Sequence, residues 1–228
     1  VAGFSILLKP NGVATFEFPH LLKLVNENQF DTIYHEHFSY LSLTALETIF
    51  KENGLQVFDV EECATHGGSL RLFAQRSDTG VRIVSEQLIE LSKREIDAGM
   101  NNSNFYKNFQ KKANIVKDDL LNFLIKAKQD GKKVVAYGAA AKGNTLMNYA
   151  GIRSDLISYV VDRSPSKHSK YMPGSRIPIH TEQFLKYDKP DYVLILPWNL
   201  KSEVIKQLSY ITENGGNFVV AVPKLEVI

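Results

Sequence analysis

A phenol, two imidazoles and a carboxylate occupy four consecutive positions of this chain, Tyr34-His35-Glu36-His37. Histidine accepts or releases a proton near neutral pH because its unperturbed pKa is about 6.5, and a neighbouring Glu or Tyr can orient the ring or share the proton. This density of proton-transfer groups favours acid–base chemistry. Two alternatives remain, a structural pair of histidines and a metal site, although no HExxH spacing is present and no further Cys or carboxylate ligand is specified.

A second candidate site is a turn that opens a helix after an apolar strand, Gly138-Ala139-Ala140-Ala141-Lys142-Gly143-Asn144. Gly138 and Gly143 occupy the first and third glycine positions of the dinucleotide fingerprint, but Ala140 replaces the middle glycine. Against the P-loop pattern Asn144 stands at the lysine position, so a kinase or NTPase is not expected. Amide donors at the positive end of a helix nevertheless favour a phosphate, and Lys142 can add a full charge.

Three further features follow the strands of this region. Asp162 lies about 20 positions beyond Gly143, close to where an acidic residue contacts a ribose hydroxyl in dinucleotide folds. Trp198, the single tryptophan, stands beside Asn199 and is suited to stacking on a base; a tryptophan of the core or an interface is the alternative. The polar, basic stretch 164–174 either folds over phosphates or is a plain solvent loop. For the glycine turn and Asp162 the alternative is a tight turn packed with alanines and a solvated carboxylate.

The segment Thr65-His66-Gly67-Gly68-Ser69-Leu70-Arg71 separates two expected strands. In a functional interpretation His66, Ser69 and Arg71 face a polar ligand, and the paired glycines allow close approach. In the alternative the glycines only make a hairpin turn and His66 is exposed.

The first of three segments positions the histidine cluster. A strand is expected at 13–18, then the loop with the cluster, then a helix from Thr44 as N-cap to Asn53-Gly54. Strands near 55–62 and 69–76 follow. This order resembles the end of an α/β sheet with a closing hairpin.

Residues 81–130 show helical patterns, broken around 99–102, that link two sheet domains. Residues 132–228 alternate strand and helix, with strands at 134–137, 157–161, 192–196 and 218–222 and helices at 142–149, 181–185 and 203–211. Such alternation predicts a parallel sheet with helices on both faces. We therefore predict an α/β protein with three parts, residues 1–80, 81–130 and 131–228.

Composition excludes several classes of function. The 27 Lys and Arg nearly balance 25 Asp and Glu, giving a net charge of +2 and no long basic run, so nucleic acid is not an expected partner. The single Cys63 cannot form an internal disulfide or a multi-thiolate zinc site and fits a reducing cytoplasm. The apolar residues 1–8 are too short, and lack the basic leader, for a signal peptide or a membrane span. Because no initiating Met is present, a fragment of a longer protein is expected.

Four motifs together resemble the S-adenosylmethionine-dependent C-methyltransferases that act on nucleotide-linked deoxysugars: Tyr34-His35-Glu36-His37-Phe38-Ser39-Tyr40-Leu41, His66-Gly67-Gly68-Ser69-Leu70-Arg71, Tyr137-Gly138-Ala139-Ala140-Ala141-Lys142-Gly143 and Val161-Asp162-Arg163-Ser164-Pro165. The resemblance implies a partial methyltransferase sheet, a helical linker and a Rossmann-like domain that helps to hold the nucleotide-sugar. It also implies upstream zinc and cofactor domains in the same protein, S-adenosylmethionine as cofactor and a dTDP-sugar or similar partner in deoxysugar biosynthesis.

The chemistry implied by the resemblance is removal of a proton from a carbon next to a sugar ketone, giving an enolate whose carbon attacks a sulfonium methyl group. Carried over by position, His37 is the base, Tyr34 and Glu36 are donor and orienting partners, and His35 is structural. Two other functions compete: a nucleotide-sugar binding module without catalysis, and an NAD-dependent dehydrogenase, which Ala140 disfavours.

Overall fold

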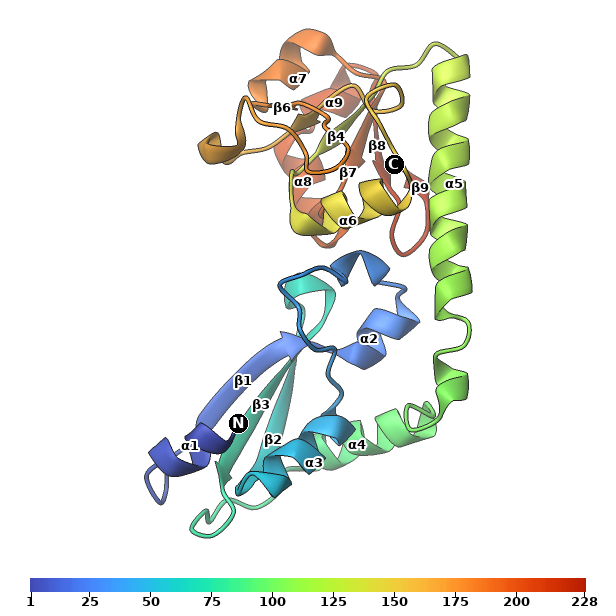
Figure 1. Ribbon diagram of the computed structural model, residues 1–228. Coiled ribbons are helices and arrows are strands. Elements are labelled where there is room, and N and C mark those ends of the chain that lie inside the picture. Colours follow the sequence, from blue (N-terminus) through green and yellow to red (C-terminus); the bar gives the residue numbers. More distant parts are fainter. The chain divides into compact units, whose positions relative to one another are not determined.

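The structure is a computed structural model that describes residues 1–228. It is α/β, which confirms the predicted class (Figure 1). The chain forms two compact units. Unit 1 contains residues 1–27 and 38–109, and unit 2 contains residues 28–37 and 110–228. The segment 28–37, which carries the histidine cluster, thus belongs to unit 2, although the residues on both sides of it belong to unit 1.

Unit 1 is built on a three-stranded antiparallel sheet in the order β1-β3-β2. Its strands are β1 Ala14–Pro19, β2 Leu55–Cys63 and β3 Ser69–Arg76, and its helices are α1 Ala2–Leu7, α2 Leu21–Asn26, α3 Leu43–Glu52 and α4 Glu86–Asp97. The predicted strands and hairpin are confirmed. The core of this unit joins α3, α4 and the sheet through Leu43, Leu46, Phe50, Leu55, Val57, Val60, Leu70, Leu72, Ala74, Leu88 and Leu91.

The start of α3 differs from the prediction. Its N-cap is Ser42, whose hydroxyl accepts a hydrogen bond from the amide of Ala45 at 3.1 Å. The hydroxyl of Thr44, the predicted cap, donates instead to the buried Glu95 of α4 at 2.6 Å. Both residue types cap helices well, so a partner distant in sequence decides between them.

Unit 2 contains a six-stranded sheet in the order β6-β5-β4-β7-β8-β9, parallel except for β9. Its strands are β4 Val134–Tyr137, β5 Val160–Val161, β6 Ile179–His180, β7 Tyr192–Ile195, β8 Asn217–Val220 and β9 Glu226–Val227. Its helices are α5 Phe109–Gln129, of which the first residue belongs to unit 1, α6 Ala141–Tyr149, α7 Gln183–Asp188, α8 Lys201–Gln207 and α9 Tyr210–Glu213. The predicted parallel sheet is confirmed, but the helix expected at 203–211 is two helices.

The carboxyl end of β4 is where the predicted ligand residues gather. All four residues of β4 are buried, as expected for a central parallel strand covered on both faces. Gly138, Asp162 and Trp198 follow β4, β5 and β7, which are neighbours in the sheet. Ligands of open α/β sheets bind at this edge. None of the helices combines the length and the apolar character that a membrane crossing requires.

Candidate active site

The glycine turn after β4 packs directly against the loop that follows β7. Gly138 has a φ of 91°, and a Cβ atom built there would lie 2.5 Å from Cδ of Pro197. A Cβ atom on Gly143 would lie 2.6 Å from Cβ of Leu196. Both positions therefore require glycine because the side chains of Pro197 and Leu196 approach the backbone of the turn closely, independently of any ligand.

Asp162, which was predicted to contact a ribose, connects the glycine turn to the basic loop, residues 164–174. Its Oδ2 accepts a hydrogen bond from the amide of Ala139 at 2.7 Å and lies 3.1 Å from Nζ of Lys167, while its Oδ1 accepts from the amide of Ser164 at 2.8 Å. Both carboxylate oxygens are thus engaged within the protein.

A cavity of about 440 Å³ lies beside this turn, wholly within unit 2. Its lining residues are Tyr34, His35, Ala139, Ala140, Ala141, Asn144, Thr145, Ser166, Lys167, Lys170, Tyr171, Met172, Pro173 and Ile179. The volume is in the range of small-ligand pockets. Among the predicted site residues, Tyr34, Ala139, Ala140 and Asn144 line it. The basic stretch 164–174 was predicted as a whole, without single site residues, and it supplies six lining residues from Ser166 to Pro173.

The electrostatics of the cavity favour an anion. No Asp or Glu lines it, whereas Lys167 and Lys170 do. The helix α6 begins at its edge with Ala140 as N-cap, a residue without a side-chain acceptor for the first amides of the helix. Because the positive end of the helix dipole and the ammonium groups act together, a phosphate is favoured and a cationic ligand is disfavoured.

Three predicted ligand residues, two of them buried, form a cluster instead of lining the cavity. Trp198 is only 9% exposed, and the ammonium of Lys142 lies 4.5 Å from its ring centroid and 3.2 Å from Oδ1 of Asn199. Burial lowers the pKa of Lys142. The indole N–H of Trp198 donates to Oδ2 of Asp31 at 2.7 Å.

Asp31 is a residue that sequence reasoning missed. Its side chain is fully buried, and burial raises its pKa to about 6 despite the hydrogen bond from Trp198. Its Oδ1 has no hydrogen-bond partner. The one signal in the sequence was its place just before the histidine cluster.

His37, the predicted base, is half-buried and oriented by the backbone. Its Nδ1 lies 2.8 Å from the carbonyl oxygen of Thr32 and must donate, since a carbonyl only accepts. Its ring centroid lies 4.3 Å from that of Tyr34. A neutral His37 ring in this arrangement carries its lone pair on Nε2, the state that a general base requires. His35, for which a structural role was expected, is exposed and lines the cavity, and Glu36 is exposed.

The remaining predicted residues, His66, Ser69 and Arg71, belong to unit 1. The guanidinium of Arg71 forms ion pairs with Glu17 at 2.9 Å and Glu61 at 2.7 Å. The buried hydroxyl of Ser69 donates to the carbonyl of Thr65 at 3.1 Å. These contacts hold the sheet and its turn together, and a ligand role for the three residues stays a prediction.

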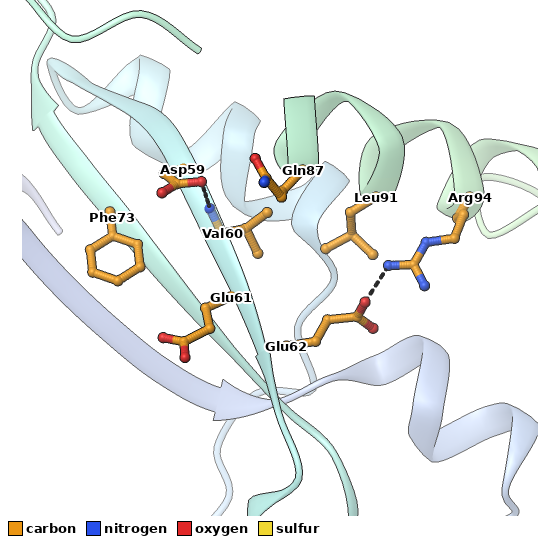
Figure 2. Close-up of a pocket in the computed structure, with 8 residues that line it drawn as sticks. All are labelled: Asp59, Val60, Glu61, Glu62, Phe73, Gln87, Leu91 and Arg94. Carbon is orange, nitrogen blue, oxygen red and sulfur yellow. Dashed lines mark hydrogen bonds and ion pairs between the residues drawn. The ribbon is translucent and has the colours of Figure 1, made fainter. Parts of the chain in front are cut away.

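A second cavity, of about 460 Å³, lies in unit 1 between β2, β3 and α4 (Figure 2). Figure 2 shows Gln87, Leu91 and Arg94 on one face of α4 and the ion pair of Arg94 with Glu62. The guanidinium nitrogen of Arg94 lies 2.5 Å from the carboxylate oxygen of Glu62. Asp59 and Glu61 complete an acidic lining in which carboxylates outnumber the single guanidinium. Such a lining is unsuited to a phosphate ligand.

Comparison with known proteins gives two matches. Residues 64–223 match the family described as C-methyltransferase C-terminal domain. The C-methyltransferase NovU of Streptomyces niveus is 39% identical over 229 aligned residues, which cover 99% of this chain and 54% of NovU. The chain thus spans about half the length of this relative.

Proposed function

The chain belongs to the C-methyltransferase family, and on this premise we propose that it holds a nucleotide-linked keto-deoxysugar while the whole protein methylates a carbon of the sugar. The observation that carries the proposal is the cavity of unit 2. Tyr34 and His35 line the same cavity as the glycine turn and Lys170. A diphosphate at the turn therefore leaves the sugar within reach of the proton-transfer segment. We place this reaction in cytoplasmic deoxysugar biosynthesis.

Proton removal is the step that we assign to this chain. In the proposed step the Nε2 lone pair of His37 takes a proton from the carbon next to the sugar ketone, and the electrons of the C–H bond form the double bond of an enolate. The hydroxyl of Tyr34 donates to the enolate oxygen, and the carbonyl of Thr32 orients the imidazole. A positioned base typically contributes about 10² to 10⁴-fold to the rate.

S-Adenosylmethionine is the cofactor that we propose for the whole protein, on the strength of the family. It supplies an electrophilic methyl group on a sulfonium cation. The cavity of unit 2 does not fit this cofactor, because its charged lining consists of Lys167 and Lys170. We therefore assign the cofactor to residues outside this cavity.

Calorimetric titration of this chain tests the proposal. A dTDP-sugar and S-adenosylmethionine are titrated separately, and we expect heat of binding with the dTDP-sugar only. Absence of binding by the dTDP-sugar would contradict the assignment of the cavity. A dTDP-sugar that binds, combined with a whole protein whose turnover does not depend on His37, would indicate a binding module without a catalytic role.

A further inference from the structure

The segment 28–37 is attached to unit 2 by buried contacts that use specific side chains. The 3₁₀-helix η1 Phe30–Thr32 packs against α6, and the ring of Phe30 lies 5.2 Å from that of Tyr149. The carboxylate of Asp31, fully buried, accepts the indole N–H of Trp198 at 2.7 Å. A hydrogen bond to a charged acceptor is about twice as strong as one between neutral groups, so this contact attaches η1 firmly to the loop after β7.

A short covalent path connects this attachment to His37. Thr32 follows Asp31 directly, and its amide and hydroxyl both donate to the carbonyl of Gln29, at 3.1 and 2.7 Å. The carbonyl of Thr32 accepts the Nδ1 proton of His37 at 2.8 Å. The backbone group that selects the tautomer of His37 is therefore fixed one residue away from the buried carboxylate.

We propose that Asp31 and Trp198 are positioning residues for His37: their hydrogen bond fixes η1 on unit 2, so that the carbonyl of Thr32 holds His37 with its proton on Nδ1 and its lone pair on Nε2. This inference rests on the proposed function, in which His37 is the base. Neither positioning residue lines the cavity. They act on the direction and tautomer of the imidazole, while the nucleotide is bound by other residues.

The chain contains one tryptophan and six histidines, so the indole N–H gives one assignable resonance and His37 can be identified by substitution. Long-range ¹H–¹⁵N spectra of the full 228-residue chain report the tautomer of each neutral imidazole. Trp198→Phe removes the donor and leaves the ring, and Asp31→Leu removes the acceptor without leaving an unpaired charge. Asp31→Asn retains an oxygen that can accept from Trp198. Tyr159→Phe is the control, because it removes another aromatic donor from a carboxylate of unit 2, Asp188, at 2.8 Å.

We expect Trp198→Phe and Asp31→Leu to lower the ratio of the Nδ1–H to the Nε2–H tautomer of His37 about fivefold, the effect of losing one hydrogen bond. Asp31→Asn should restore most of the ratio, and Tyr159→Phe should leave it unchanged. An unchanged ratio in Asp31→Leu, or an equal change in Tyr159→Phe, would overturn the inference. Calorimetry with dTDP on the same samples tests the proposed function separately from the positioning role of Asp31 and Trp198. A wild-type chain that does not bind dTDP would reject the proposed function, whereas the dependence of the His37 tautomer on Trp198 would still stand.

Discussion

Nε1 of Trp198 lies 2.7 Å from Oδ2 of Asp31, across 167 positions of the sequence. The hydrogen bond joins the loop after β7 to the segment that carries Tyr34 and His37. The proton-transfer residues and the cationic cavity lie in the same compact unit. In the function proposed above, one unit binds the nucleotide and presents the base to the attached sugar.

The raised pKa of Asp31 makes the stability of unit 2 dependent on pH. The pKa rises from 3.8 to about 6 because of burial, so the folded state binds this proton more tightly than the unfolded chain. Stability conferred by the neutral carboxyl is therefore lost as the pH rises from about 4 through 6. We expect Asp31→Asn to stabilise unit 2 by about 3 kcal/mol at pH 8, at about 1.4 kcal/mol per pKa unit, and to have little effect at pH 4. Urea unfolding followed by Trp198 fluorescence measures the free energy of unfolding of both proteins at the two pH values. An Asp31→Asn variant less stable than wild type at pH 8 would be evidence against a raised pKa of Asp31.

Substitution of Gly138 tests the close packing of the turn. Gly138→Ala adds a Cβ atom 2.5 Å from Pro197 at a φ of 91°, and we expect a loss of about 3 kcal/mol in the free energy of unfolding. Gly151→Ala is the matched control, because Gly151 has a φ of 69° but no atom within 4 Å of its Cβ position. That variant should lose only about 1 kcal/mol. Equal losses would show that backbone conformation, rather than contact with Pro197, requires glycine.

Lys170 provides a test of the anion site. It is exposed in the basic loop and lines the cavity, and we expect Lys170→Gln to weaken dTDP binding about tenfold through loss of a charge-assisted hydrogen bond. Lys201→Gln is the control, since Lys201 is a half-exposed lysine of unit 2 that pairs with Glu226 at 2.9 Å and does not line the cavity. Calorimetry at two salt concentrations measures the dTDP affinity of both variants. Equal effects of the two substitutions would indicate general charge attraction and no specific site.

Glu95 is a buried residue of unit 1 whose carboxylate accepts hydrogen bonds from His20 and from the start of α3. Burial alone raises its pKa, but hydrogen bonds from His20, Thr44 and the amide of Leu43 outweigh this and hold the pKa below its usual value. Glu95→Ala should destabilise unit 1 by about 3 kcal/mol because these donors lose their acceptor. Hydrogen exchange of the first amides of α3 measures the loss, with the exposed Glu90→Ala on the same helix as control. Protection equal to that of the wild type would contradict this role.

Much of the fold could be predicted from local patterns. The apolar run of β4 and the glycine after it indicated a central parallel strand, and the alternation that follows indicated the sheet of unit 2. The strands β6 and β9 were missed because two residues are too few to show a periodicity. Tertiary partners also decided details, such as the N-cap of α3, which depends on Glu95.

The site could be predicted only in part. Its glycine turn and basic loop were found because composition and position marked them. Asp31 was not singled out, and its contact with Trp198 was not foreseen, because a single sequence does not show that two side chains 167 positions apart meet. Residue type alone also suggested that Lys142 binds phosphate, whereas its ammonium lies over the Trp198 ring.

The central claim is that His37 removes a proton from the sugar, and deuterium exchange tests it most directly. The whole protein is incubated in D₂O with a dTDP-linked keto-deoxysugar, and deuterium at the carbon next to the ketone is followed by NMR. We expect His37→Asn to lower the exchange rate at least about 10²-fold with dTDP-sugar affinity nearly unchanged. The control is His180→Asn, which changes a histidine of unit 2 that does not line the cavity and should retain most of the rate. Exchange at the wild-type rate in His37→Asn would contradict the account.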